Sequence, residues 1–460
     1  MYPSGFNREY TDEEFYFRFG KPALAVRSPP EGSEIVWLGI DDTDSADLGM
    51  CTTYLCAVLV ERIADSPIDI GLWDLPLLVR LNPQVPYKTR GNGAVALRLF
   101  VESGETDAAF ELARHLISEL AVLEDGNTHP GLVMMVGENR SRVLADFYGE
   151  CLHRIVEIDE ALEVVESQGL RSRGWKRGLG QIGATAAIGA DLSRDQTFEL
   201  IAYREPWKKA PDRDVDPALV MRVDQEVEGT FFNYDYQNRR VCIVPRSPCP
   251  VRFGIRGETP SAVRKGFSIV DSGSPSALLF RTNQHTDAHI ERVPEVSGVK
   301  AYSSVRLRGS VSRGPRTIEG GHVILSIRDD SGEVECAAYE PTKQFRNAIR
   351  RLIPGDAVEV YGSVRPPEDG HGPTVNLEKI QVVSLVERRL ENPFCPRCGS
   401  RLKSMGAGGG FKCKNRDCGF RDSEMGKVEV PLVRELSAGS FYEPPPVAWR
   451  HLYMPISRLG

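Results

Sequence analysis

The chain has 460 residues, with 57 lysine and arginine against 64 aspartate and glutamate side chains, giving a formal net charge of −7. Hydrophobic residues make up 41% and charged residues 26%, which is typical of globular domains and excludes bulk disorder. The mild acidity excludes a histone-like nucleic-acid binder, although local basic patches are compatible with nucleic acid. No apolar run approaches the roughly 18 residues of a membrane span, and the N-terminus has no apolar signal core. We therefore expect a soluble, cytoplasmic protein without a membrane partner, whose ten cysteines are thiols or metal ligands.

The first part of the chain alternates strands and helices. Residues 1–34 are polar and dotted with aromatic residues, and we interpret them as a loosely attached extension. Residues 35–40, IVWLGI, form a continuous apolar run that predicts a strand buried on both faces. An acidic loop follows, and then a helix beginning near Thr52. Amphipathic segments from Asp107 and Asp159 predict further helices, and the alternation favours an α/β or α+β core.

The sequence changes character twice further on. From Gly178, GLGQIGATAAIGA is rich in small residues and is followed by strands and Gly/Pro turns. From Val299, five short strands with one helix before the fourth predict an OB-type barrel. The region from Phe394 to Phe420 is a cysteine-knuckle segment, and the tail beyond Ser423 has no clear element.

Three carboxylates lie at the end of the first buried strand. Asp41, Asp42 and Asp44 fall within four residues, at the place where ligands bind in α/β folds. Adjacent carboxylates repel one another unless a cation joins them, and magnesium prefers oxygen ligands and bridges to phosphates. The helix start at Thr52 would turn free N–H groups toward the same crevice. The alternative is a solvated turn in which Asp44 or Ser45 caps the helix.

The segment PYKTRGNGAVAL carries Lys88, Arg90 and Asn92 ahead of an apolar strand. Lysine and arginine donate to phosphate oxygens, and the flanking glycines permit close approach of a ligand. Taken alone, the segment is an ordinary turn. Beside the acidic loop, it indicates the phosphate-binding half of a nucleotide site.

Four cysteines have the spacing of a zinc site. Cys395-x2-Cys398 is followed, after 14 residues, by Cys413-x4-Cys418. Two paired thiolates at this separation predict tetrahedral, structural zinc. Residues 388–421 contain nine lysine and arginine but two acidic residues, which favours contact with a phosphate backbone. An OB barrel before the zinc module supports nucleic-acid binding, while a protein-docking module is the alternative.

These features leave two classes of function open. The first is an enzyme with a magnesium/ATP phosphoryl-transfer site and a nucleic-acid-binding C-terminal part. The second is a non-enzymatic RNA- or single-stranded-DNA-binding protein, built on the OB-fold and zinc ribbon, whose acidic loop is only a turn. Only the enzyme requires the three aspartates to converge with Lys88 and Arg90. The sequence has no Walker A, HRD/DFG or GxGxxG signature, so a standard kinase is excluded.

Several strings together resemble one family. They are GIDDTDS (39–45), GMCTTYL (49–55), RLNPQVPYKTRGNGAV (80–95), CPVRFGIRGE (249–258), EGGHV (319–323), EPTKQFRN (340–347) and the final zinc ribbon. In this order they are similar to the archaeal tRNA(Ile) 2-agmatinylcytidine synthetase family. The resemblance implies a multidomain α+β protein that uses ATP, Mg²⁺ and Zn²⁺. It implies linkage of agmatine to carbon 2 of the wobble cytidine of CAU-anticodon isoleucine tRNA, through a phosphorylated cytidine, so that AUA is decoded as isoleucine.

The resemblance also implies a domain order. It consists of an extension (1–34), a kinase-like α/β domain unrelated to standard kinases (35–177), a ferredoxin-like domain (178–295), an OB-fold (296–388), a zinc ribbon (389–425) and a tail (426–460). The extension before residue 35 and the wide Cys413-x4-Cys418 spacing depart from the expected pattern.

Residue roles follow from the matched motifs. Asp41, Asp42 and Asp44 would hold magnesium and orient phosphates, and Thr52 matches the threonine that the family autophosphorylates. Lys88, Arg90 and Asn92 would lie near the ATP phosphates. Agmatine is a dication and requires an acidic or carbonyl-lined pocket. For this pocket we suggest three aspartates of the second domain: Asp224, Asp235 and Asp287. The alternative is that these three are turn residues.

Overall fold

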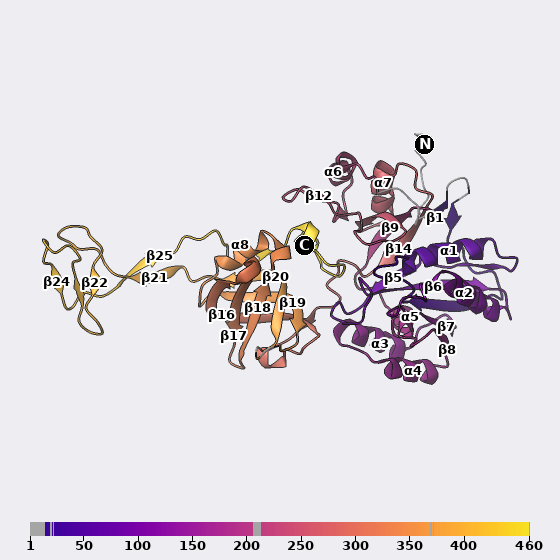
Figure 1. Ribbon diagram of the computed structural model, residues 1–460, viewed down its shortest axis with the longest axis horizontal. Helices are drawn as coiled ribbons and strands as arrows, with labels where there is room; N and C mark the ends of the chain where they lie inside the picture. Colours follow the sequence, from indigo (N-terminus) through magenta and orange to yellow (C-terminus); the bar gives the residue numbers. More distant parts are fainter. Residues whose placement is uncertain are drawn as a thin grey trace.

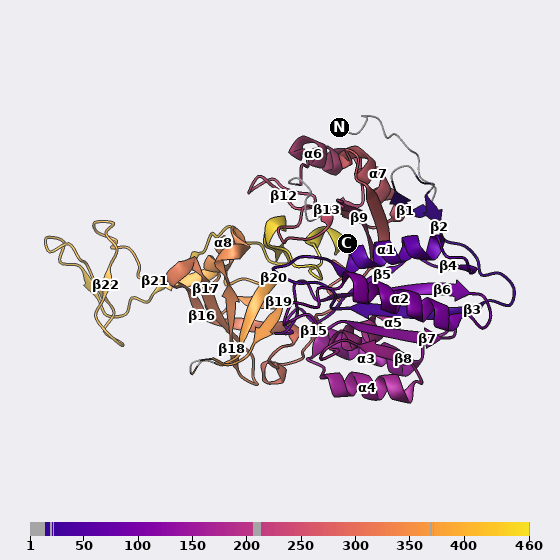
Figure 2. The same cartoon turned by 45° about the vertical axis from the view of Figure 1, so that its right-hand side comes forward.

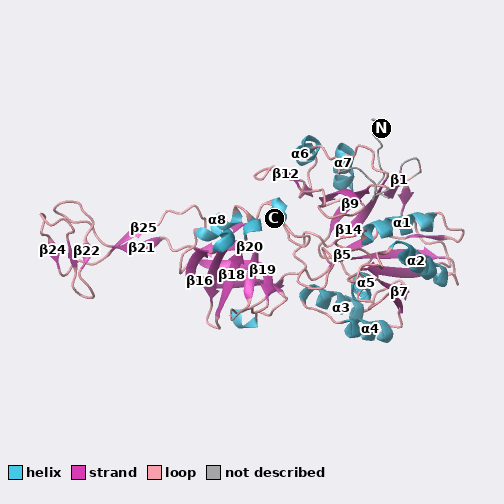
Figure 3. Cartoon of the chain, in the orientation of Figure 1, coloured by secondary structure: helices cyan, strands magenta, loops and turns pink. Residues whose placement is uncertain are grey.

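The computed structural model describes residues 14–18, 21, 23–205, 213–368, 370 and 372–459. It is elongated, with the N-terminal two domains at one end, the zinc ribbon at the other and the OB-fold between them (Figure 1). The mixture of helix-covered sheet, barrel and ribbon confirms a multidomain α+β protein (Figure 3). Within the described residues, no helix is both long and apolar enough to cross a membrane.

The first domain is a sheet covered by helices on both faces. Its strands are β3 (Glu34–Asp41), β4 (Ile70–Leu72), β5 (Leu77–Arg80), β6 (Gly93–Val101), β7 (Gly131–Val136) and β8 (Arg171–Gly174). Its helices are α1 (Thr52–Ala64), α2 (Thr106–Leu120), α3 (Arg142–His153), α4 (Ile158–Ser167) and α5 (Gly180–Gly189). In β3, Val36, Leu38 and Ile40 join the core beneath α1 and α2, while Trp37 joins the core beneath α3 and α5. The continuous apolar run therefore does form a strand buried on both faces.

Helix α5 packs unusually close to the sheet, because glycines stand where the two meet. A Cβ on Gly39 of β3 would lie 2.1 Å from the carbonyl oxygen of Ala184, and one on Gly131 of β7 would lie 2.0 Å from the Gln181 nitrogen. Only glycine permits such an approach of backbone to backbone. The N-terminal end of α5 is thereby held at the end of β3, beside Asp41.

The second domain has the strand order of a ferredoxin-like fold. Its elements are β9 (Thr197–Tyr203), α6 (Pro217–Glu226), β10 (Thr230–Phe231), the small hairpin β11 (Tyr234–Asp235) and β12 (Arg240–Val241), β13 (Val251–Gly257), α7 (Pro260–Val270) and β14 (Ser276–Thr282). The sheet runs β10-β13-β9-β14, and β14 then pairs in parallel with β5 of the first domain. One twelve-stranded sheet therefore spans both domains, which fixes them relative to each other.

Part of the N-terminal extension belongs to this sheet. Strand β1 (Glu14–Arg18) pairs antiparallel with β14 and with β2 (Leu24–Ala25). Phe15, Tyr16 and Phe17 are buried. The expectation of a loosely attached extension is therefore wrong for these residues. The prediction failed because the segment is polar overall, so its composition gives no strand signal. Its aromatic side chains nevertheless cover the edge of β14.

The OB-fold is a closed barrel of five strands. They are β16 (Ser304–Thr317), β17 (Val323–Arg328), β18 (Glu333–Ala338), β19 (Ala357–Arg365) and β20 (Thr374–Ser384), with α8 (Phe345–Arg350) before the fourth. The order β16-β17-β18-β20-β19 closes through a β16–β19 pairing. Short strands β15 (Glu291–Arg292) and β26 (Phe441–Tyr442) pair with β16 and β20.

The zinc ribbon stands on a two-stranded stalk. Strand β21 (Arg388–Glu391) pairs with β25 (Val428–Pro431), and the ribbon between them contains β22 (Lys403–Ser404), β23 (Phe411–Lys412) and β24 (Arg421–Asp422). After the stalk the chain returns past the OB-fold, and residues near the C-terminus lie between the OB-fold and the first two domains (Figures 1 and 2).

Candidate active site

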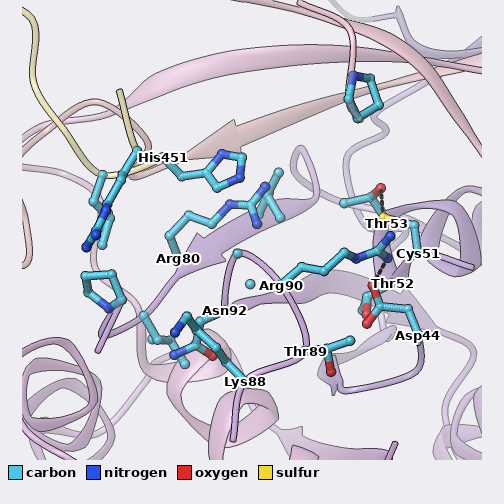
Figure 4. A pocket seen from close by; sticks show the side chains of 18 of the residues that line it. Asp44, Cys51, Thr52, Thr53, Arg80, Lys88, Thr89, Arg90, Asn92 and His451 are labelled. Atoms are coloured by element: carbon cyan, nitrogen blue, oxygen red, sulfur yellow. Dashed lines mark hydrogen bonds and ion pairs between the residues drawn. The ribbon is translucent and has the colours of Figure 1, made fainter. Parts of the chain in front are cut away.

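A cavity of about 920 Å³ lies where the first two domains and the C-terminal tail meet. The seven residues expected around the nucleotide all line it: Asp41, Asp42, Asp44, Thr52, Lys88, Arg90 and Asn92. They come from the loop after β3, the start of α1 and the loop before β6. Figure 4 labels five of these seven side chains around the same space, together with the neighbouring Thr89: Asp44, Thr52, Lys88, Arg90 and Asn92. Residues far apart in sequence thus converge at one site.

Asp42 is held by hydrogen bonds from two other loops. It follows the last residue of β3 in the left-handed backbone region, with φ of 57°. Its Oδ1 accepts from the Thr89 hydroxyl at 3.0 Å, and its Oδ2 accepts from the His129 backbone N–H at 2.8 Å. Burial raises the pKa of Asp42, and these hydrogen bonds oppose the shift.

Asp44 forms an ion pair with Arg90. The Arg90 guanidinium also donates to the Met50 carbonyl oxygen at 2.6 Å and to the Ser247 hydroxyl at 3.1 Å. The arginine therefore connects the acidic loop, the start of α1 and the second domain. Its planar donor set suits simultaneous contact with several oxygens, including those of phosphate.

Asp41 lies beneath the first turn of α5. A Cβ on Gly183 would be 1.9 Å from Asp41 Oδ2, so the glycine leaves the space that the carboxylate occupies. Asp41 Oδ1 accepts from the Asp42 backbone N–H at 2.7 Å. Burial and the neighbouring Asp42 carboxylate raise the pKa of Asp41 to about 7. A bound cation would reverse this shift.

Thr52 is the first residue of α1 and is nearly buried, with 4% of its surface exposed. Its hydroxyl lies 3.0 Å from the Thr43 hydroxyl. The N-cap residue, Cys51, makes no side-chain capping bond, but its carbonyl oxygen accepts from the Tyr54 and Leu55 N–H groups at 2.9 and 3.0 Å. The helix start therefore presents the positive end of the helix dipole and the Thr52 hydroxyl to the cavity.

The loop before β6 is shaped by internal hydrogen bonds. Asn92 has φ of 46° and donates from Nδ2 to the Asn82 carbonyl oxygen at 2.8 Å. Lys88 Nζ donates to the Val85 carbonyl oxygen at 3.0 Å. Burial and the positive charge of Arg450 lower the pKa of Lys88. Lys88 thus lines the cavity without a carboxylate partner.

The three aspartates expected to bind agmatine lie outside this cavity. Asp224 on α6 accepts from Asn233 at 2.8 Å, and Asp287 forms an ion pair with Lys379 of the OB-fold. Asp235 accepts from the Asn238 amide at 2.9 Å and lines a second cavity of about 440 Å³. The structure therefore does not bring the three together, and their role remains a prediction.

The four ribbon cysteines converge. One ligand atom from each of them lies within 4.8 Å of the others. The Sγ atoms of Cys395 and Cys418 are 3.6 Å apart, and those of Cys398 and Cys413 are 3.4 Å apart. The four residues between Cys413 and Cys418 therefore do not prevent this pair from reaching the other two cysteines. This arrangement is a four-cysteine zinc site of the structural type.

Several cavity residues escaped the sequence analysis. Trp449, Arg450 and His451 reach the cavity from the tail, and Figure 4 shows His451 beside Arg80. Glu199 of β9 pairs with Arg256 of β13 at 2.7 Å in the same wall. The string CPVRFGIRGE, which contains Arg256, was a signal for the second domain. Nothing in the tail sequence indicated a site.

The fold and the site together define a class of multidomain protein. A helix-covered domain and a ferredoxin-like domain share one sheet and one cavity, and an OB-fold and a zinc ribbon follow them. Four family models match in this order. They are the TiaS TCKD domain (37–176), the TiaS FLD domain (178–289), the OB-fold nucleic acid binding domain (305–383) and the TiaS C-terminal zinc ribbon domain (392–436).

Full-length relatives agree with these matches. The chain is 44% identical to the isoleucine-tRNA 2-agmatinylcytidine synthetase TiaS of Archaeoglobus fulgidus, over 92% of this chain and 98% of the relative. It is also 44% identical to the TiaS of Methanosarcina mazei, over 92% and 97%. A crystal structure of TiaS in complex with isoleucine tRNA and ATP superimposes with a TM-score of 0.82 at 42% identity, covering 93% of this chain and 98% of that one. A complex of TiaS with isoleucine tRNA, AMPCPP and agmatine gives 0.79 at 39% identity, with the same coverage. The chain belongs to the TiaS family of isoleucine-tRNA 2-agmatinylcytidine synthetases.

Proposed function

We propose that this protein joins agmatine to carbon 2 of the wobble cytidine of CAU-anticodon isoleucine tRNA at the expense of ATP, so that AUA is decoded as isoleucine. The observation that carries the proposal is the convergence of the acidic loop, the start of α1 and the Lys88–Asn92 loop on one cavity. A non-enzymatic RNA-binding protein has no need of that convergence. Family membership and the complexes of relatives with isoleucine tRNA, ATP and agmatine support the same function.

The chemistry requires activation of a poor leaving group. We propose that the carbon-2 oxygen of the cytosine takes the γ-phosphoryl group of ATP, with release of ADP. The primary amine of agmatine then attacks carbon 2, the carbon–oxygen bond breaks, and the oxygen leaves with inorganic phosphate. The target base must leave its stack to reach the cavity.

Among the described residues, the four ribbon cysteines are the one group of three or more potential ligands close enough to share an ion, so the carboxylates of Asp41, Asp42 and Asp44 do not converge on one point. Magnesium would be held by one or two of these three carboxylates, with phosphate oxygens and water completing its shell, and when bound it would neutralise phosphate charge. Arg90, with Lys88 and Asn92 beside it, would orient the phosphates.

Thr52 is the residue that we propose is autophosphorylated. Its hydroxyl stands at the N-terminal end of a thirteen-residue helix, where the helix dipole would stabilise an added phosphate group. Thr52 is nearly buried and lines the cavity, so the phosphoryl donor would reach its hydroxyl from the cavity. For agmatine, Asp235 is the aspartate of the predicted three that lines a cavity, and Asp235→Asn should raise the KM for agmatine with little effect on that for ATP.

Oxygen transfer tests the phosphorylated intermediate. A CAU-anticodon isoleucine tRNA would be prepared with ¹⁸O at carbon 2 of the wobble cytidine and incubated with enzyme, ATP, Mg²⁺ and agmatine. The account predicts that the modified tRNA loses the label and that inorganic phosphate gains it. Label in AMP would indicate adenylylation instead, and label retained in agmatine-modified tRNA would contradict activation at this oxygen.

A further inference from the structure

The C-terminal tail connects the OB-fold to the cavity. Its course between the OB-fold and the first two domains is visible in both overall views (Figures 1 and 2). The backbone N–H groups of His285 and Asp287 donate to the carbonyl oxygens of His451 and Leu452, each at 2.8 Å. Arg458, at the end of the tail, pairs with Asp195 at 2.9 Å. These contacts fix the tail along the segment that follows β14.

One buried lysine of the OB-fold secures the middle of the tail. Lys379 on β20 has a side chain that is 1% exposed. Its Nζ donates to the Met454 carbonyl oxygen at 2.7 Å and pairs with Asp287. Asp287 in turn accepts from the Met454 N–H at 2.7 Å. A buried ammonium group is strongly disfavoured without such partners, so Lys379 holds the OB-fold, the β14 segment and the tail in one arrangement.

The tail brings a cation into the cavity. Arg450 lines the cavity and is exposed, and its side chain makes no hydrogen bond or ion pair with the residues that the structure describes. The nearby carboxylate of Glu378 is already engaged by His289 at 3.0 Å and by Ser363 at 2.8 Å. Arg450 and Lys88 therefore lie at one cavity, close enough for the positive charge of Arg450 to disfavour the charged form of Lys88.

Glu378 attracts Arg450 only at a distance, and neither Arg450 nor Lys88 forms an ion pair with a carboxylate among the described residues. Two such cations at one cavity repel each other until an anion lies between them. Phosphate oxygens suit this position, since lysine supplies a compact point charge and arginine a planar set of donors. Both ATP and the backbone of tRNA present such oxygens.

We propose that Arg450 and Lys88 form a phosphate-binding subsite of the cavity, and that Lys379 is a positioning residue that places Arg450 through the tail. The proposal rests on the proposed function, because the phosphate belongs either to ATP or to tRNA. The proposal adds Arg450, from the last part of the chain, to the site. It also connects the OB-fold to the site through the contacts of Lys379 with the tail.

The first experiment compares Arg450→Gln with the wild-type chain in two binding assays: ATP without tRNA, and CAU-anticodon isoleucine tRNA without ATP. Loss of one charged contact should weaken one of the two affinities about tenfold. Weaker ATP binding identifies a nucleotide phosphate. Weaker tRNA binding, with a shallower dependence on salt, identifies a backbone phosphate. The matched control is Arg142→Gln, whose side chain is 91% exposed and lies outside the cavity.

Unchanged affinity of Arg450→Gln for both ligands would overturn the subsite. If the wild-type chain itself binds neither ATP nor tRNA, the proposed function fails instead. The two outcomes are therefore distinguishable.

The positioning role is tested by a double-mutant cycle. Lys379→Met should weaken the same ligand as Arg450→Gln, and the double variant should be little weaker than the stronger single variant, because both changes remove one contact. Additive losses of affinity would show that Lys379 acts independently of Arg450 and would overturn its positioning role. Should Lys379→Met not fold, Asp287→Asn takes its place, since it weakens the ion pair but keeps an acceptor for the Met454 N–H.

Discussion

Arg90 and Asp44 form an ion pair across the mouth of the cavity, although 46 residues separate them in the sequence. Because Arg90 also donates to Met50 and Ser247, this one side chain ties the acidic loop to α1 and to the second domain. The pair explains how a loop with three carboxylates is stable before a metal or nucleotide binds. Arrival of phosphate oxygens would offer Arg90 a competing partner and free Asp44 for magnesium.

Replacing Asp44 with asparagine should abolish tRNA modification while tRNA binding survives. The amide keeps the shape of the side chain but removes the charge that would meet magnesium, so we expect kcat to fall at least about 100-fold. The same result is expected for Asp41→Asn. Steady-state rates and tRNA affinity are the measurements, with Asp47→Asn, an exposed residue of the same loop, as the control. Normal rates for both variants would refute the metal-site proposal.

The ionised Glu378 carboxylate should stabilise the folded protein, and this contribution should be lost in acid. Burial would raise the pKa of this carboxyl, but His289, the positive charge of Arg450 and the Ser363 hydroxyl lower it to about 2, against an ordinary value of 4.5. A group with a lowered pKa in the folded state contributes stability above pH 4.5 and loses it as pH falls toward 2. Glu378→Gln should therefore lower the free energy of unfolding by roughly 3 kcal/mol at pH 6, with the difference shrinking as the pH falls below 4.5.

Urea unfolding of both proteins at pH 6, 4 and 3 would measure this difference. Titrating groups that do not contact Glu378 are common to the two chains and cancel. A constant difference at all three pH values would contradict the assigned role of Glu378.

Serine at Cys395 and Cys398 should release zinc and weaken tRNA binding. Two thiolates cannot complete a tetrahedral site, and the ribbon depends on the ion because its apolar core is small. Metal analysis should find about one zinc per wild-type chain and little in the variant. Cys242→Ser, which lies outside the ribbon, is the control and should keep its zinc. Full zinc content in the double variant would show that these cysteines are not the ligands.

Alanine at Phe15 should destabilise the body of the protein by about 3 kcal/mol, because the ring is 1% exposed against the edge of β14. Val433→Ala, at a side chain with 94% exposure, should change stability by less than about 0.5 kcal/mol. Denaturant unfolding compares the two. Equal stability of Phe15→Ala and wild type would mean that β1 contributes nothing to the folded sheet.

Local patterns predicted a good part of the fold. Three elements follow from hydrophobic patterns within a short stretch of sequence: the buried strand β3, helix α1 and the short strands of the OB-fold. The structure contains all three. The zinc site was predictable because its four ligands lie within one short segment and their spacing is dictated by tetrahedral geometry.

Long-range relationships were not predictable in the same way. The polar extension gave no sign that Phe15 covers a strand more than 250 residues later. The tail carries no periodic pattern, so the approach of Arg450 and His451 to the cavity had no local signal. Asp287 was expected in an agmatine pocket because it is acidic, whereas its partner, Lys379, lies in another domain. Such pairings are decided by tertiary packing between distant segments, and short-range sequence patterns do not reveal it.

Incorporation of labelled agmatine into a transcript of CAU-anticodon isoleucine tRNA, with ATP and Mg²⁺, tests the central claim most directly. The CAU-anticodon methionine tRNA, which shares the anticodon, is the matched control. The account predicts ATP-dependent incorporation into the isoleucine tRNA and none into the methionine tRNA. Absence of incorporation while the isoleucine tRNA is bound would contradict the proposed activity, and equal labelling of both would contradict the proposed selectivity.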